Sequence, residues 1–174
     1  MKLPWRFLTV VLAVVAGSLL LAACGGGDGE ELSLDEYFQQ LDSIEEGIKT
    51  GTAALDEASA GVIGEDVEAT RDYIDGYQGI VGEAANDMKD LDPPSEVGDA
   101  HDEFVAALSG MVSVWGDLSD RLGDVETTTE MQTLLMDTQA EEPWQTATQR
   151  FTEACRALQG IADEKGIDID LDCG

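Results

Sequence analysis

The 174-residue chain has few basic residues, a single histidine and only three cysteines. Nine Lys and Arg stand against 37 Asp and Glu, so the formal net charge is −28. Proteins that bind nucleic acids or anionic lipid surfaces use Lys and Arg to neutralise phosphates. The scarcity of these residues argues against both kinds of partner, and we expect no nucleic-acid binding.

The sequence also lacks the common motifs of catalytic and metal sites. It has no His-Glu-x-x-His, no Gly-x-Ser-x-Gly and no phosphate-binding glycine loop. A di-metal bundle of the ferritin type needs two Glu-x-x-His motifs, but Gly98 stands three residues before His101. Acidic pairs such as Glu45-Glu46 and Glu141-Glu142 lie off the apolar helix faces, so we interpret them as solvated. We therefore expect no enzymatic activity and no cofactor.

The start of the chain has the layout of a secretory signal. Lys2 and Arg6 precede an apolar run over residues 7–21, and small residues follow it. The run is somewhat short for a membrane span, which needs about 20 residues and is the alternative interpretation. No Arg-Arg pair is present, which favours the general secretory route over the twin-arginine route.

The string Leu21-Ala22-Ala23-Cys24 resembles the lipobox of bacterial lipoproteins. That resemblance implies cleavage before Cys24 and two or three acyl chains on this residue, which anchor a protein stably where one chain does not. It places the protein at the cell membrane, facing the extracytoplasmic side. We thus expect a signal peptide over residues 1–23, a glycine-rich flexible tether over 24–32 and a folded domain over 33–174.

Besides the lipid-modified Cys24, the expected mature chain has two cysteines. Cys155 and Cys173 form an even pair in an oxidising compartment, which predicts one disulfide. Closing this loop is worth about 3 kcal/mol by the loop-entropy estimate. A reactive thiol pair is the alternative, but the sequence has no Cys-x-x-Cys.

Apolar and small residues recur every three or four positions over most of the domain, which is typical of amphipathic helices. Ser33 and Thr127 begin capping boxes, Ser95 is a candidate cap for the third long helix, and Pro143 suits a first helical turn. Gly61 and Gly64, the pair Pro93-Pro94, and Gly166 mark breaks. Three long apolar faces result, from Leu34 to Ala58, Val67 to Leu91 and Val97 to Val125. A short piece from Met131 to Leu135 and a shorter fourth face from Trp144 to Ile161 follow them.

This pattern predicts an all-α fold. We expect an antiparallel four-helix bundle with a short extra helix before the last one. A coiled-coil oligomer is the rival interpretation, and the short breaks between the helices favour a monomer. Gly76, Gly79 and Gly82 either weaken the second helix or let a neighbouring helix approach closely.

The tail over residues 167–173 alternates apolar and acidic residues, which predicts an extended segment with one buried face. Its Asp168, Asp170 and Asp172 have the spacing that begins an EF-hand loop, but Cys173 stands where that loop needs glycine. We interpret them as a solvated acidic edge, with weak calcium binding as the alternative. This ending, together with the turn before His101, is similar to helical lipoproteins of bacteria whose activity is not characterised.

Met88 and His101 should lie close together if the chain reverses at Pro93-Pro94. Such a pair inside a bundle can ligate haem or copper. The plainer interpretation is a packed histidine with one hydrogen bond beside a space-filling methionine, and we expect no metal site. The sequence thus predicts a non-catalytic lipoprotein that binds a protein partner or serves the envelope structurally. A bundle that binds haem, copper or a small ligand is the alternative.

Overall fold

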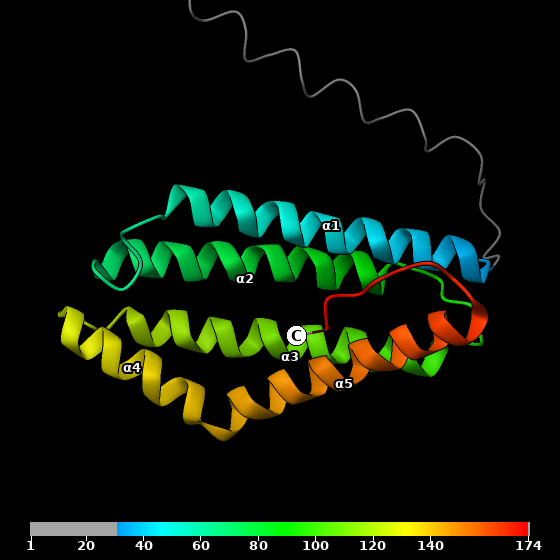
Figure 1. Ribbon diagram of the computed structural model, residues 1–174. Coiled ribbons are helices and arrows are strands. Elements are labelled where there is room, and N and C mark those ends of the chain that lie inside the picture. The colour runs from blue at the N-terminus through cyan, green and yellow to red at the C-terminus, as the bar shows by residue number, and fades with distance from the viewer. Residues whose placement is uncertain (1–30, 174) are drawn as a thin grey trace, which may run out of the picture. The chain divides into compact units, whose positions relative to one another are not determined.

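The computed structural model describes residues 31–173, and within them the fold is all-α, as predicted (Figure 1). No strand occurs in this part of the chain. The predicted signal peptide, Cys24 and the predicted tether up to residue 30 lie outside it. Its helices are α1 (Leu34–Ala58), α2 (Val67–Lys89), α3 (Gly98–Leu122), α4 (Thr128–Ala140) and α5 (Glu142–Lys165).

Both predicted capping boxes are present. The Ser33 hydroxyl accepts the Glu36 N–H at 3.3 Å, and the Glu36 carboxylate accepts the Ser33 N–H at 3.1 Å. Thr127 and Glu130 repeat the arrangement at 3.3 Å and 3.0 Å. Each box satisfies two backbone N–H groups that a helix start leaves without partners. α1 and α4 therefore begin where the sequence predicted.

The predicted cap at Ser95 is wrong. Residues 95–97 form a turn in which the Val97 N–H donates to the Pro94 carbonyl at 2.9 Å. This turn places Val97 at the cap of α3, with no side-chain hydrogen bond. The Ser95 N–H instead donates to the Glu31 carboxylate. Ser95 is therefore two residues too early to cap the helix.

The chain breaks fall at the predicted glycines and prolines. Gly61 and Gly64 have φ of 81° and 80°, a conformation that favours glycine, and they lie between α1 and α2. α2 ends before Pro93-Pro94, and Gly166 ends α5 with φ of 72°. α4 is longer than predicted. It runs for 13 residues, whereas the predicted short helix was based on the apolar residues from Met131 to Leu135.

Packing follows the order α1–α2–α3–α5, and α4 contacts α3 and α5. In the described part of the chain, α1 and α5 do not form a packed pair of this kind. The tail after Gly166 turns back along α5 and lies against α1 (Figure 1). This arrangement leaves a space between α1 and α5 that the tail fills only in part.

Two glycines of α2 differ in whether a neighbouring helix packs closely against them. A Cβ added to Gly76 would lie 2.9 Å from Leu55 Cδ1, so Gly76 permits close approach of α1. A Cβ on Gly79 would meet nothing within 4 Å, so Gly79 serves no such contact. The first glycine is a packing requirement, and the second only lowers helix propensity.

The main core lies among α1, α2, α3, α5 and the tail, and a smaller one lies toward α4. Tyr37, Met88 and Leu158 are fully buried in the main core, and Met131 in the smaller one. Glu31 and Leu32, at the end of the predicted tether, contact the α2–α3 connection, where the Leu32 N–H donates to the Asp92 carbonyl at 3.1 Å. In the described region no helix is both long enough and apolar enough to cross a membrane.

Candidate ligand-binding groove

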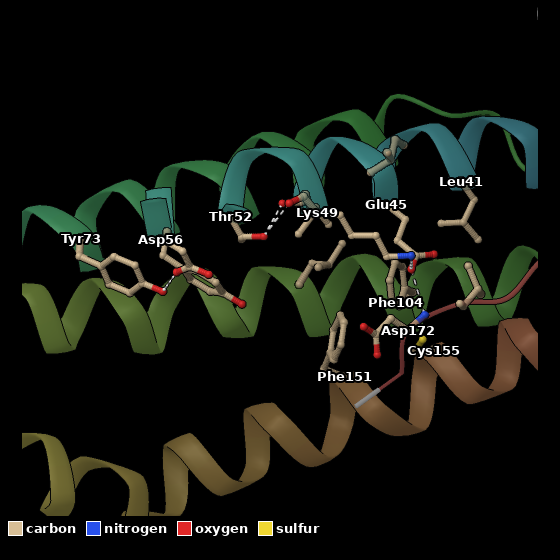
Figure 2. Close-up of a pocket in the computed structure, with 15 residues that line it drawn as sticks. Leu41, Glu45, Lys49, Thr52, Asp56, Tyr73, Phe104, Phe151, Cys155 and Asp172 are labelled. Atoms are coloured by element: carbon tan, nitrogen blue, oxygen red, sulfur yellow. Dashed lines mark hydrogen bonds and ion pairs between the residues drawn. The ribbon is translucent and has the colours of Figure 1, made fainter. Parts of the chain in front are cut away.

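A groove runs between α1 and α5, with α2 and α3 beneath it (Figure 2). Its volume is about 360 Å³, within the range of small-molecule sites. Most of its lining is apolar or aromatic. The lining residues are Leu41, Ile44, Glu45, Ile48, Lys49, Thr52, Asp56, Tyr73, Tyr77, Phe104, Leu108, Phe151, Cys155, Leu171 and Asp172.

The groove exists because α5 and the tail cover only part of the apolar face of α1. Leu41 lies where the tail packs and is 2% exposed. Ile44 and Ile48 continue the same face but are only half-buried, because neither α5 nor the tail covers them. The sequence predicted both as core residues, and the structure places them in the groove wall instead.

Two tyrosines of α2 contribute the end of the groove that lies away from the tail. The Tyr73 hydroxyl donates to Asp56 Oδ1 at 2.8 Å. Burial raises the pKa of Tyr73 to about 12, with further contributions from its hydrogen bond to Asp56 and the charge of that carboxylate. Burial also raises the pKa of Tyr77, with the charge of Asp56 acting in the same direction. Both hydroxyls are therefore neutral donors near neutral pH.

Tyr77 also connects the groove to the tryptophans. Its ring centroid lies 4.7 Å from that of Trp115, which lies 4.7 Å from that of Trp144. The Trp115 Nε1 is buried and has no hydrogen-bond partner within the described region. The environment of these indoles therefore depends on Tyr77, and their fluorescence is a suitable probe of the groove.

A charged cluster occupies the other end of the groove (Figure 2). Glu45 Oε1 lies 2.7 Å from Lys49 Nζ and accepts the Asp172 N–H at 3.0 Å. The hydrogen bond to Glu45 raises the pKa of Lys49, and the charges of Glu45, Asp172 and Glu46 add to this effect. The whole groove thus carries three carboxylates and one ammonium group, which makes it net acidic.

Glu45 is not a solvated residue, so that prediction is wrong for one member of the pair. Its side chain is 15% exposed, and its Oε2 is buried without a hydrogen-bond partner in the part of the chain described. Glu46 is exposed as predicted. Of the second pair, Glu141 forms two hydrogen bonds of 2.9 Å with Arg121, and Glu142 is exposed.

The tail forms the wall nearest the charged cluster. Its apolar residues face inward, with Leu171 8% exposed, and its aspartates are exposed, as the alternation predicted. Gln159 of α5 holds its backbone, because Nε2 donates to the Ile169 carbonyl at 3.0 Å and Oε1 accepts the Leu171 N–H at 2.8 Å. These two bonds replace those that a neighbouring strand would make.

The predicted disulfide is present and fixes the end of the tail. Cys155 and Cys173 are bonded across a Cα–Cα distance of 5.4 Å. Cys155 is buried and contributes to the groove floor. The tail is therefore held by one covalent bond, by Gln159 and by Glu45.

His101 and Met88 lie outside the groove. His101 is 4% exposed and Met88 is fully buried. The His101 Nδ1 lies 3.2 Å from the Tyr37 hydroxyl, and burial lowers the pKa of His101, with the charge of Asp102 opposing that effect. No group of three His, Cys, Asp or Glu side chains suited to a metal occurs within residues 31–173.

Sequence reasoning missed one residue of the groove wall, Glu45, and two that hold the tail beside it, Phe38 and Gln159. Phe38 is off the predicted apolar face of α1, yet it is 1% exposed and lies against the start of the tail. A large aromatic residue beside the predicted face was a signal for a second packing partner. Neither Glu45 nor Gln159 carried a comparable signal, because both occupy positions that are ordinarily solvent-facing.

Comparison of the chain with protein-family models, curated proteins and solved structures found no match.

Proposed function

We propose that this protein is a lipid-anchored, non-catalytic binding protein on the extracytoplasmic side of the cell membrane. The lipobox-like string ending at Cys24 is the basis for the anchor, and the order of helix packing is consistent with an antiparallel four-helix bundle. The groove between α1 and α5 is its binding site. The observation that carries the binding role is the half-buried apolar face of α1, with Ile44 and Ile48 in a groove of about 360 Å³.

The occupant is a small apolar organic cation. The groove supplies an apolar body site, and its charged side chains are Glu45, Asp56, Asp172 and Lys49. This net acidic lining repels carboxylates and phosphates, including the propionates of haem. Tyrosine rings also attract cations to their faces, by about 0.5–1 kcal/mol at exposed sites. Charge complementarity therefore favours a cation over a neutral or anionic ligand.

A catalytic role has little support from the residues around the groove. Its lining, as far as residues 31–173 define it, contains no histidine, and its cysteine is oxidised. Nucleophilic catalysis needs a free nucleophile beside a base. Binding needs only shape, apolar area and a few polar groups, all of which the lining provides.

Benzyltrimethylammonium tests this proposal, with benzenesulfonate as an anion of similar size. The exported protein in phosphatidylcholine nanodiscs is titrated with each, and tryptophan fluorescence is followed. We expect saturable binding of the cation and at least about tenfold weaker binding of the anion, a difference of about 1.4 kcal/mol. Empty nanodiscs correct for partition into lipid.

Two matched variants assign the site. Ile48→Arg places a positive charge in the groove and should abolish cation binding. Ile63→Arg makes the same change at a 40% exposed position outside the groove and should leave binding unchanged. Equal affinity of the cation for both variants would contradict the proposed site, and binding of a protein partner at Ile48 in place of the small cation would contradict the proposed ligand.

A further inference from the structure

We infer that the Cys155–Cys173 disulfide sets the length of the groove, so that its reduction admits longer apolar ligands. This inference rests on the proposed function, because it concerns the same groove. It adds a regulatory role for the two cysteines and for the tail that they hold.

The tail fills one end of the space between α1 and α5. Leu171 and Asp172 border the open groove, while Ile167 and Ile169 lie farther along, against Phe38. The residues beneath the tail are apolar and almost fully buried, with Phe38 1% and Leu41 2% exposed. Removing the tail would therefore extend the apolar wall of the groove from Leu41 to Phe38.

Contacts other than the disulfide hold the tail weakly. They comprise the bond from the Ile167 N–H to the Ala162 carbonyl at the end of α5, the two hydrogen bonds with Gln159, the bond from Asp172 to Glu45, and one buried side chain, Leu171. Water replaces such hydrogen bonds at small net cost when a surface segment detaches. Ile167 and Ile169 are only half-buried. The covalent bond is thus the contact that keeps the tail in place.

The two sulfur atoms differ in access. Cys173 is half-buried on the tail, whereas Cys155 is 3% exposed. A thiolate of a dithiol reductant attacks the Cys173 sulfur, the S–S bond breaks, and its electron pair goes to the Cys155 sulfur, which takes up a proton. The second thiol of the reductant then attacks the reductant's first sulfur, which is bonded to Cys173 in the mixed disulfide. The Cys173 sulfur leaves as a thiolate and takes up a proton. Two electrons and two protons pass to the protein, and the reductant leaves as a cyclic disulfide.

The groove then differs between the two states. With the disulfide formed, it ends at Leu171 and fits a short apolar cation. After reduction the wall extends along α1, so that a ligand with a longer alkyl chain gains apolar contacts. Each additional buried methylene contributes to affinity in proportion to the apolar area removed from water.

The test compares two quaternary ammonium probes before and after treatment with dithiothreitol. Octyltrimethylammonium, used below its micelle-forming concentration, should bind the reduced full chain in nanodiscs about tenfold more tightly than the oxidised chain. Benzyltrimethylammonium, which already fits the short groove, should change by less than about threefold. A double variant, Cys155→Ser with Cys173→Ser, should bind like the reduced protein and should not respond to dithiothreitol.

Hydrogen exchange provides a readout that does not depend on any ligand. On reduction, amides of residues 167–173 should exchange faster, while those of α2 and α3 stay protected. If reduction unfolds the protein, the variant Leu171→Ala tests the same point with the disulfide intact. It removes the side chain that closes this end of the groove, so it should raise octyltrimethylammonium affinity without reductant.

Unchanged exchange in the tail, or equal octyltrimethylammonium affinity in both redox states, would overturn the inference. Failure of both probes to bind in either state would instead contradict the proposed function. Hydrogen exchange then decides the inference by itself, because release of the tail on reduction supports control of the groove and continued protection excludes it.

Discussion

The backbone N–H of Asp172 donates a hydrogen bond of 3.0 Å to Glu45 Oε1, which joins the end of the tail to the middle of α1. These residues are far apart in the chain, and no other described contact of the tail's backbone reaches α1 by hydrogen bonding. The bond marks the boundary between the part of the interhelix space that the tail fills and the groove that remains open.

Gln159 should contribute more to stability than an ordinary surface glutamine. Gln159→Ala removes both hydrogen bonds to the tail backbone and should lower the free energy of unfolding by about 1–2 kcal/mol. Gln149→Ala, on the same helix, removes only an exposed bond to Glu153 and should change it by less than about 0.5 kcal/mol. Urea unfolding of the two variants measures the difference, and equal effects would show that Gln159 does not hold the tail.

Gly76 and Gly79 should respond oppositely to alanine. Gly79→Ala adds a methyl group in open space and should stabilise α2 by up to about 1 kcal/mol. Gly76→Ala places its Cβ against Leu55, and the displacement of that side chain should cost about 1–3 kcal/mol. Thermal unfolding of both variants tests this, and a stabilising Gly76→Ala would mean that Leu55 moves aside freely.

His101 should make stability depend on pH. Burial lowers its pKa in the folded state, so the neutral ring is favoured there, and the unfolded chain binds a proton more readily. The resulting stability is complete above the unfolded pKa of about 6.5 and is lost as the pH falls below it toward the folded pKa.

The variant His101→Gln isolates this contribution from that of the many carboxylates. At pH 8 it should be about 1 kcal/mol less stable than the natural chain, because the hydrogen bond with Tyr37 is lost or weakened. The difference should shrink between pH 6.5 and 5. A difference that stays constant across this range, measured by urea unfolding, would exclude titration of His101 as its cause.

Cys24 should carry the membrane anchor. Intact-mass measurement of the protein from native membranes should give a chain that begins at residue 24 with added acyl mass. Cys24→Ala should prevent lipid attachment and processing at this site. A natural chain that starts elsewhere, or that has an unmodified Cys24, would contradict the anchor.

Local sequence signals predicted the helices well because each depends on a few neighbouring residues. The capping boxes at Ser33 and Thr127, the prolines at 93–94 and the glycine at 166 act over one helical turn. Ser95 failed because a hydrogen bond from its own N–H to Glu31, a residue distant in sequence, accompanies a turn there. The tail was predicted equally well, since alternation and a cysteine pair define its inward face.

The groove could not be predicted in the same way. Ile48 has the same periodicity as Leu41, and the positions of α5 and the tail decide which of them is covered. Glu45 lies off the apolar face of α1, and its contacts with the distant Asp172 and with Lys49 have no signal in the sequence. Both outcomes depend on which helices pack together, whereas periodicity identifies only which face of each helix is apolar.

The most direct test of the binding role is to locate the bound cation within the groove. Nuclear Overhauser effects can be measured between the N-methyl protons of benzyltrimethylammonium and the side chains of the oxidised protein. We predict contacts with Tyr77 and Ile48, and none with Met136, which is 66% exposed on α4. Contacts confined to residues outside the groove, or no contacts at saturating cation, would contradict the account.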